Sequence, residues 1–445
     1  MRVRNFFATV CLASLAQAAS PGTAPTYYRD VAPVMQKRCQ ECHRPGEAAP
    51  MSFLSYKEVR PWAKAIKEAV AVKKMPPWYA DPHYGKFDND RSLTATEVET
   101  LLRWVDAGAP EGNAKDAPKP LQFTEGWAIG KPDVVYEMPQ AFPVQSSGTI
   151  EYQYIVIPTG FTEDKWVMAA EARPDKRDVV HHIIAFIREP GSKWLQEAKP
   201  GVPFVPERRQ RSRQEGEGAA SREENTAPQA ELLVGFAPGL PPGVLRPGQA
   251  RLVKAGSDLV LQMHYTASGT ARTDRSRVGL VFAKEPVKER VVTLAASNGK
   301  FAIPPGAPSH EVESAFTFYG PAKLVSMMPH MHLRGKDFEY RAVYPDGHKE
   351  VLLSVPKYDF NWQLFYYLAD QKELPKGTKI ECTAHFDNSA KNAANPDATV
   401  EVKWGDQSWE EMMIGWFDVA IDVNRNIREL FPPRRPQTQR ASSDQ

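Results

Sequence analysis

The feature that most constrains this chain is the short sequence Cys39-Gln40-Glu41-Cys42-His43. Two thiols at this spacing can form thioether bonds to the vinyl groups of a haem, and the adjacent imidazole then becomes an axial iron ligand. A CxxC pair can also belong to a thioredoxin-like or a zinc site. Zinc would need two more ligands from distant parts of the chain, however, and no βαβ pattern surrounds the motif. We therefore expect one c-type haem attached at Cys39 and Cys42 and ligated by His43.

The first residues predict export. Met1-Arg2-Val3-Arg4 precedes an apolar stretch from Phe6 to Leu15, and small residues follow around Ala18. This order is typical of a secretory signal, so we expect residues 1–19 to be a signal peptide and the protein to reach the periplasm or to be secreted. The apolar stretch is too short for a membrane span, and no later segment approaches the required length. Covalent haem attachment, which takes place outside the cytoplasm, agrees with export.

Cysteine usage and charge exclude several classes of protein. After signal removal only Cys39, Cys42 and Cys382 remain, and the haem uses the first two, so we expect a disulfide-free protein. Cys382 is then expected to be a buried core thiol, with soft copper ligation as the alternative. The 445 residues are 42% hydrophobic, which is enough material for two or three domain cores. A net charge of +2 with interspersed signs indicates no nucleic-acid partner.

Residues 20–112 are expected to form a small all-α domain. Thr94-x-x-Glu97 is a capping box, and Gly108 ends the helix that follows it. The apolar positions of this helix share one face: Val98, Leu101, Leu102 and Val105. A haem motif near the first helix and an amphipathic closing helix together resemble class I cytochromes c. Residues 113–125 then read as a linker.

The sixth iron ligand is expected in the sequence Lys74-Met75-Pro76-Pro77-Trp78. A thioether on a proline-stiffened loop reaches iron at little ordering cost, and Met ligation raises the haem potential. The resemblance to class I cytochromes c favours Met75. The alternatives are that Met75 only packs on the ring, or that His83 is the ligand.

Beyond residue 125 the pattern changes to short β-branched and aromatic runs between turn signals, which predicts β-sandwiches. The expected strands are 150–157, 179–187, 259–265, 315–318, 338–344 and 412–421. Residues 206–230 contain a basic run and little apolar content, and are expected to be a disordered insertion. The tail from 432 to 445 is also expected to be disordered.

Histidines point to metal sites in this β region. Five of them lie in strand-like apolar surroundings: His181, His182, His264, His330 and His332. A single histidine in an apolar strand is usually a hydrogen-bonded core residue, but five in three strands indicate ligation. His330 and His332 project to the same face of a strand and can hold one ion together.

His181 and His182 would face opposite sides of a regular strand. Both can bind one ion only at a strand end, a bulge or a strong twist, and His264 could complete that site. Alternatively, one of these two histidines is a metal ligand and the other forms a hydrogen bond within the core. Imidazole sites suit copper or zinc, whereas a Met thioether favours Cu(I).

These histidines, taken with their neighbours, resemble the copper type II ascorbate-dependent monooxygenases, whose animal members include the peptidylglycine hydroxylating and dopamine β-hydroxylating enzymes. The resemblance covers roughly residues 130–425. It rests on His181-His182, Leu261-Gln262-Met263-His264-Tyr265, His330-x-His332-Leu333-Arg334-Gly335-Lys336 and Trp409-Glu410-Glu411-Met412-Met413.

The resemblance implies two antiparallel, jelly-roll-like β-sandwiches, at 126–290 and 291–431, with one copper ion each. It implies that His181, His182 and His264 hold an electron-transferring copper, and that His330, His332 and Met412 hold the copper that binds O2. Met412 is chosen over Met413 by its position in the family. Neighbouring strand residues face opposite sides, so only one of the two can face the copper.

Two features depart from the animal enzymes. Met328 stands where the peptide-processing enzyme has an arginine for the substrate carboxylate, which disfavours peptide amidation. The disulfides of those enzymes cannot form here. The aromatic run 355–363 can line a cleft or belong to a core, and we leave it unassigned. His310 and His385 could orient metal ligands, although a structural or surface role is the stronger expectation.

Together these features predict a copper-dependent monooxygenase that hydroxylates a C–H bond of a small organic substrate with O2. Electrons would come through the fused haem, from ascorbate or from another periplasmic donor. The catalytic residues would be His330, His332 and Met412. The alternatives are a non-catalytic electron-transfer or copper-binding cytochrome, and a copper oxidase that hydroxylates nothing.

Overall fold

The computed structural model describes residues 24–47, 49–123, 126–206, 230–237 and 239–433. The expected signal peptide, nearly all of the expected insertion and the tail beyond residue 433 lie outside these ranges. The chain forms two compact units. A smaller unit contains the described residues up to Arg44 together with 51–75 and 93–120, and a larger unit contains 45–50, 76–92 and the chain from Leu121 onward. No helix of the described ranges is long and apolar enough to cross a membrane.

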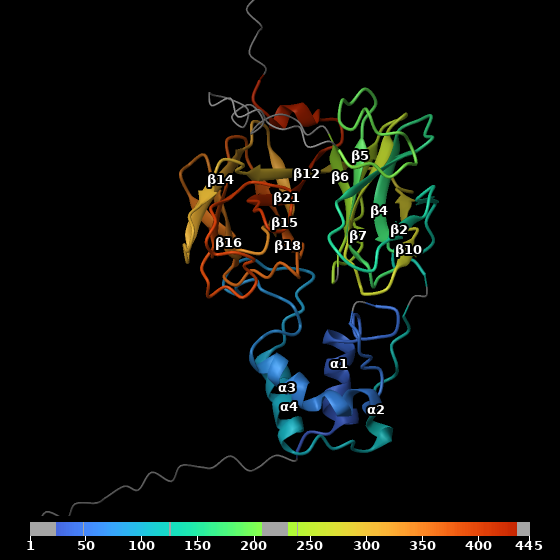
Figure 1. The fold of residues 1–445 in the computed structure, drawn as a ribbon, viewed down its shortest axis with the longest axis vertical. Coiled ribbons are helices and arrows are strands. Elements are labelled where there is room, and N and C mark those ends of the chain that lie inside the picture. Colours follow the sequence, from blue (N-terminus) through green and yellow to red (C-terminus); the bar gives the residue numbers. More distant parts are fainter. Residues whose placement is uncertain (1–23, 48, 124–125, 207–229, 238, 434–445) are drawn as a thin grey trace, which may run out of the picture. The chain divides into compact units, whose positions relative to one another are not determined.

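The smaller unit is helical (Figure 1). It consists of a π-helical turn Tyr27–Val31, α1 Ala32–Arg38, α2 Tyr56–Val59, a 3₁₀ turn Arg60–Trp62, α3 Ala63–Ala71, α4 Ala95–Asp106 and a 3₁₀ turn Ala114–Asp116. The capping box at the start of α4 is present: the Thr94 hydroxyl accepts from the Glu97 N–H, and the Glu97 carboxylate accepts from the Thr94 N–H. Leu101 and Trp104 of α4 are buried in the core of this unit.

The first β-sandwich lies within the larger unit (Figure 1). One of its sheets has the order β3-β9-β5-β6, and the other contains β1-β11-β4-β8 with β7 beside β4. The strands are β1 Val134–Glu137, β2 Phe142–Val144, β3 Gln153–Pro158, β4 Lys165–Arg173, β5 Val180–Arg188, β6 Glu231–Phe236, β7 Gly243–Val244, β8 Gln249–Val253, β9 Asp258–Tyr265, β10 Arg272–Asp274 and β11 Arg277–Phe282. Its core is formed by alternating inward residues such as Ile155, Ile183 and Leu261.

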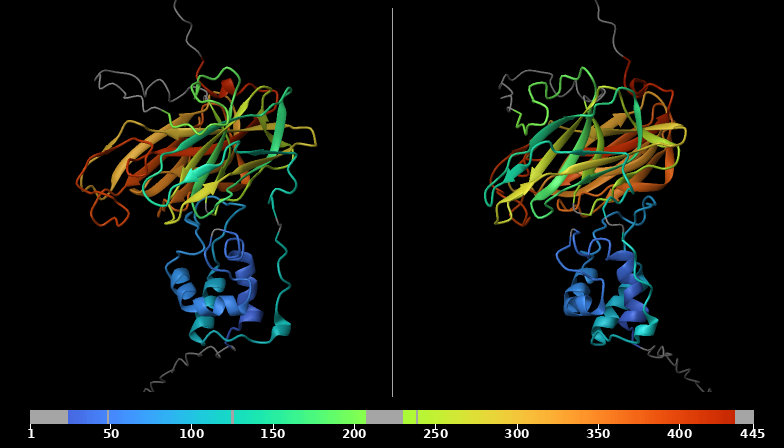
Figure 2. Two further views of the ribbon diagram at one scale, coloured as in Figure 1. Left: turned by 45° about the vertical axis from the view of Figure 1, so that its right-hand side comes forward. Right: turned by 90° about the vertical axis from the view of Figure 1, so that its right-hand side faces the viewer.

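The second sandwich pairs the sheet β14-β19-β16-β17 with the strands β12-β21-β15-β18. The strands are β12 Glu289–Ser297, β13 Ala302–Ile303, β14 His310–Thr317, β15 Ala322–His330, β16 Gly335–Val343, β17 Lys349–Val355, β18 Tyr366–Leu374, β19 Lys379–Phe386, β20 Val402–Lys403 and β21 Ile414–Asp422, followed by a 3₁₀ turn Ile427–Leu430. Cys382 is a free thiol buried in this core, as expected. Figure 2 shows that α1 to α4 gather in the smaller unit, whereas strands build the larger one.

The two sandwiches share a sheet, which the sequence pattern did not predict. β8 and β12 pair in parallel over Gln249–Ala250 and Glu289–Arg290, so the two halves join into one nine-stranded sheet. Two buried ion pairs lie near this junction, Arg251 with Asp418 at 2.9 Å and Arg290 with Glu231 at 2.8 Å. Each buried charge therefore has a partner, but Oε1 of Glu231 and Nε of Arg290 form no hydrogen bond within the described residues, so the pairing offsets only part of the lost hydration.

Residues 76–92 pack with the larger unit, although they fall inside the range 20–112 that we expected to be one helical domain. Phe87 forms an antiparallel bridge with Leu368 of β18. The Asp88 N–H donates to the Tyr367 carbonyl at 2.9 Å, and the Ala369 N–H donates to the Lys86 carbonyl at 2.8 Å. These residues continue the sheet beyond β18.

Candidate metal centres

The first histidine cluster combines His181 and His182 of β5 with His264 of the neighbouring strand β9. The pairing of β5 with β9 shifts register between Val180 and His182, and His182 lies opposite His264. His181 is therefore the extra residue of a β-bulge, the irregularity that two adjacent histidines need in order to face one ion. The Nδ1 atom of His182 lies 3.3 Å from the Nδ1 atom of His181 and 3.3 Å from that of His264.

These separations fit a bound metal ion. Two nitrogens bonded to one tetrahedral ion at about 2.0–2.1 Å lie about 3.3 Å apart. A ligating nitrogen from each of the three histidines lies within 4.8 Å of the other two. The Tyr152 ring packs against this cluster, 4.7 Å from the His264 ring and 5.6 Å from the His182 ring.

Burial keeps these imidazoles neutral. It is the main cause that lowers the pKa of His264 to about 4, and the nearby His181 adds to the effect. Burial also lowers the pKa of His182 well below its ordinary value, and His264 and His181 lower it further. A neutral imidazole has the free lone pair that a metal requires. The cluster is therefore ready to bind a cation at neutral pH.

The second cluster contains His330, the last residue of β15, and His332 just beyond it. The Nδ1 of His330 lies 2.6 Å from the side-chain Oε1 of Gln363, and the Nδ1 of His332 lies 3.2 Å from the main-chain oxygen of Glu410. Because both oxygens are acceptors, each Nδ1 is the protonated nitrogen and each Nε2 keeps its lone pair. The two rings are 5.3 Å apart, and Met331 between them is fully buried.

A buried carboxylate holds the backbone of the second cluster. The two oxygens of Glu411 accept the main-chain N–H groups of His332, at 2.8 Å, and Arg334, at 2.6 Å. Glu411 and Arg334 are 0% and 1% exposed. Burial, followed by the neighbouring His330, lowers the pKa of His332 to about 3, so this imidazole is also neutral. The arrangement fixes the position of His332 before any ion binds.

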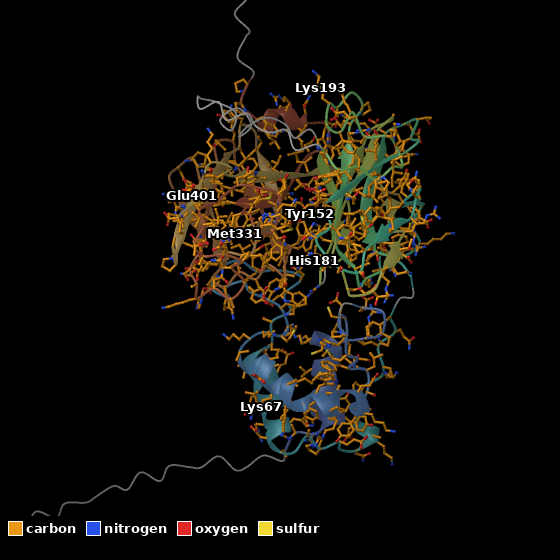
Figure 3. The ribbon with its side chains drawn as sticks, viewed as in Figure 1. Lys67, Tyr152, His181, Lys193, Met331 and Glu401 are labelled. Carbon is orange, nitrogen blue, oxygen red and sulfur yellow. The ribbon has the colours of Figure 1, made fainter. Side chains whose placement is uncertain are left out.

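His181 and His182 of the first cluster and both histidines of the second line one cavity of about 720 Å³, together with Met412, whereas His264 is not among its lining residues in the described ranges. The neighbouring Met413 is 0% exposed and belongs to the core of the second sandwich. The structure therefore places Met412, and not Met413, at the cavity that His330 and His332 line, and its role as a copper ligand stays a prediction. Tyr152 and His181 are labelled in Figure 3, where both come from the first sandwich on the side toward the second.

Phe360 contacts one histidine ring of each cluster. Its ring centroid is 6.1 Å from that of His181, nearly parallel to it, and 6.0 Å from that of His332. These two contacts place the His181 and His332 rings at most about 12 Å apart. Phe360 belongs to the aromatic run 355–363, which sequence reasoning left unassigned. Gln363 of the same run and Tyr152 carried no sequence signal, because only the tertiary fold brings them to the histidines.

The CxxCH motif follows α1 in the helical unit. The main-chain N–H groups of Cys42 and His43 donate to the Cys39 carbonyl at 3.2 and 2.9 Å, so the motif forms a tight turn. The His43 Nδ1 bonds the Met51 carbonyl at 3.2 Å, and Phe53 stacks on the His43 ring at 4.2 Å. The carbonyl fixes the proton on Nδ1 and leaves the Nε2 lone pair free, as an axial iron ligand would need, and haem attachment at Cys39 and Cys42 stays a prediction.

The remaining candidates lie elsewhere. Met75 is half-buried just after α3, and its place as the sixth iron ligand stays a prediction. His83 bonds Asp81 at 2.6 Å. His385 bonds Asp337 at 2.6 Å and lies 3.3 Å from Glu311, so it is held in a surface ion-pair group rather than at either cluster. His310 begins β14 opposite Phe386.

The comparisons with known proteins carry no argument about this site. No family model and no curated protein matches the sequence. Among solved structures, a structure of the infectious bursal disease virus Gt strain is similar at 11% identity and a TM-score of 0.16, covering 68% of this chain and 75% of that one. The crystal structure of the same virus's VP2 subviral particle gives 11% identity, a TM-score of 0.18, and coverage of 69% and 76%. Both scores are too low to indicate a shared fold.

Proposed function

We propose that this chain is an exported copper-dependent monooxygenase that inserts one oxygen atom of O2 into a C–H bond of a small organic molecule. Electrons would enter through a c-type haem attached at Cys39 and Cys42, or directly from ascorbate or another donor. The balanced reaction consumes one O2, two electrons and two protons, and yields the hydroxylated product and one water. When bound, the copper ions supply one-electron reduction of dioxygen, and the haem supplies stored electrons.

The observation that supports this proposal most directly is that His181 and His182 of the first cluster, both histidines of the second cluster and Met412 line one cavity. His181, His182 and His264 offer an all-imidazole ligand set. His330 and His332 offer two Nε2 atoms, and Met412 adds a soft thioether that favours Cu(I). A site for an electron-donating copper and a site for a copper that meets dioxygen would thus share one enclosed space.

The residues around the ligands set their orientation and protonation. Gln363 and the Glu410 carbonyl hold the protons of His330 and His332 on Nδ1, so that each Nε2 points its lone pair away from the protein acceptor. Aromatic side chains, including Phe360, Trp404 and Trp416, line the cavity and exclude water from part of it. Reduced water access favours hydroxylation over wasteful release of reduced oxygen.

The cavity also limits the substrate. Its volume of about 720 Å³ falls in the range of about 300–1,000 Å³ that small-molecule sites occupy. Met328 lines it at the position where a carboxylate-binding arginine would stand, and no lysine or arginine occurs among the lining residues in the described ranges. The lining also includes the acidic residues Glu151, Asp406 and Glu410, so a neutral or cationic molecule is favoured over a carboxylate such as a peptide C-terminus.

A substrate screen tests this function. The copper-loaded, reduced protein would be mixed with neutral aromatic and aliphatic compounds, each paired with its carboxylate analogue, while O2 uptake is recorded. We expect some neutral compounds to accelerate uptake and to gain one hydroxyl group, and their carboxylate partners to respond less. An O2 uptake that is the same for every compound, with no hydroxylated product, would show an oxidase or an electron carrier instead.

A further inference from the structure

The segment 76–92, here called the strap, is bound to the free edge of β18, the last strand of the nine-stranded sheet. Besides the main-chain bonds to β18, the Asn89 side chain donates to the Phe365 carbonyl at 2.7 Å and accepts the Tyr367 N–H at 3.1 Å. A paired edge no longer offers unmatched N–H and C=O groups to other chains. The strap is therefore an integral part of the larger unit.

Aromatic contacts hold the beginning of the strap. The Trp78 ring lies 4.9 Å from the Tyr366 ring, and the Phe87 ring lies 5.5 Å from it. Tyr366 is 2% exposed, so both strap residues pack on a buried side chain. Such aromatic pairs stabilise by about 0.5–1.5 kcal/mol beyond the area they bury. The position of the next residue, Tyr79, is consequently well defined.

Tyr79 forms a hydrogen bond with the loop that contains Phe360. Its hydroxyl donates to Oδ2 of Asp359 at 3.5 Å. The other oxygen of Asp359 accepts the main-chain N–H of Asn361 at 3.0 Å and its side-chain amide at 2.9 Å, and the Trp362 N–H donates to the Asp359 carbonyl at 2.9 Å. One carboxylate thus joins the strap to the tight turn that begins at Asp359.

Two other residues of this loop form hydrogen bonds with the second histidine cluster. The Tyr358 hydroxyl donates to the Met331 carbonyl at 2.7 Å and accepts the Met331 N–H at 3.1 Å. Gln363 bonds His330, as described above. Between Tyr358 and Gln363, the turn at Asp359 sets where Phe360 lies, and the Phe360 ring contacts both His181 and His332.

We propose that Tyr79 and Asp359 are positioning residues, which hold Phe360 against a histidine of each cluster and link that ring to the segment that follows Met75. Met75 directly precedes the strap, and three residues separate it from Tyr79 in the sequence. The inference rests on the proposed function, because it takes both clusters as copper sites. In the step that it serves, one electron leaves ferrous haem, which becomes ferric, and reduces one Cu(II) to Cu(I).

The test compares Tyr79→Phe with Tyr84→Phe, which changes an exposed tyrosine of the same strap. The full-length protein would be loaded with haem and Cu(II). Three quantities would be measured: copper per chain, the distribution of copper–copper distances from electron spin dipolar coupling, and the anaerobic rate of haem oxidation after rapid reduction of the haem. A third variant, Phe360→Leu, removes the aromatic ring and keeps apolar bulk.

We expect Tyr79→Phe to keep two coppers, to broaden the distance distribution and to slow haem oxidation. Loss of one hydrogen bond raises the population of a displaced loop by about two- to tenfold. The distance distribution and the rate of haem oxidation should change on this scale. Phe360→Leu should slow haem oxidation at least as much, and Tyr84→Phe should match the wild type. If Tyr79→Phe also matches the wild type, the positioning role is wrong. If the wild type binds fewer than two coppers, or bound Cu(II) does not oxidise its haem, the proposed function fails as well.

Discussion

Replacing His330 with alanine is expected to reduce bound copper from two ions per chain to one and to lower substrate-dependent O2 uptake by more than about 100-fold. Loss of an outer hydrogen-bond partner of a ligand already costs about 10–100-fold in metal affinity or activity, and loss of the ligand itself should cost more. Only His332 and Met412 would remain at that position. Copper content by elemental analysis and O2 uptake with an electrode would measure both effects.

A matched control is His348→Ala, which removes an exposed histidine that stacks on Tyr344. This variant should keep both coppers and full activity. His181→Ala should also lose one copper, but from the other cluster. If His330→Ala retains two coppers and a normal rate, the second cluster is not the site where dioxygen reacts.

Replacing Glu411 with glutamine is expected to lower the free energy of unfolding of the metal-free protein by about 1–3 kcal/mol. Both oxygens of Glu411 accept main-chain N–H groups, so the amide NH2 of glutamine must face one of those donors and leave it unpaired. An unsatisfied buried donor costs about 1–3 kcal/mol. Burial raises the pKa of Glu411 to about 8, so the comparison belongs above that pH, where the ionised carboxylate accepts from both donors. Urea unfolding followed by tryptophan fluorescence would measure the difference.

The comparison for this variant is Glu401→Gln, which changes an exposed glutamate paired with Lys403. Exposed ion pairs contribute little, so its unfolding curve should overlay that of the wild type. Glu411→Gln should in addition weaken copper binding at His330 and His332, because His332 loses a main-chain anchor. Equal stability of the two variants would mean that Glu411 does not hold this loop in place.

The local patterns of the sequence account for much of the candidate site. His330 and His332 both line the cavity while Met331 between them is buried, as the HxH spacing predicts, although β15 ends at His330 and His332 lies just beyond it. The two-residue period of a strand indicates that His181 and His182 need an irregular strand to face one ion, and β5 has a bulge at that point. The capping box at Thr94 is equally local. Each of these features depends on residues close together in the sequence.

The features that were missed depend on contacts between distant parts of the chain. Nothing in residues 76–92 indicates that they pair with β18, because that strand lies some 280 residues away, and pairing at a sheet edge leaves no periodicity in a short segment. Phe360 and Gln363 reach the histidines only when the turn at Asp359 is placed between the sandwiches. The parallel contact of β8 with β12 is likewise a consequence of how the two sandwiches pack.

The central claim is that the cavity shared by the two histidine clusters inserts oxygen into a substrate. Its most direct test follows the oxygen atoms. The copper-loaded, reduced protein would be given ¹⁸O-labelled O2 and a compound that accelerates uptake, and the product would be analysed by mass spectrometry. We predict one labelled oxygen atom in the product for each O2 consumed. Oxygen consumption that yields labelled water or peroxide and leaves the compound unlabelled would contradict the claim.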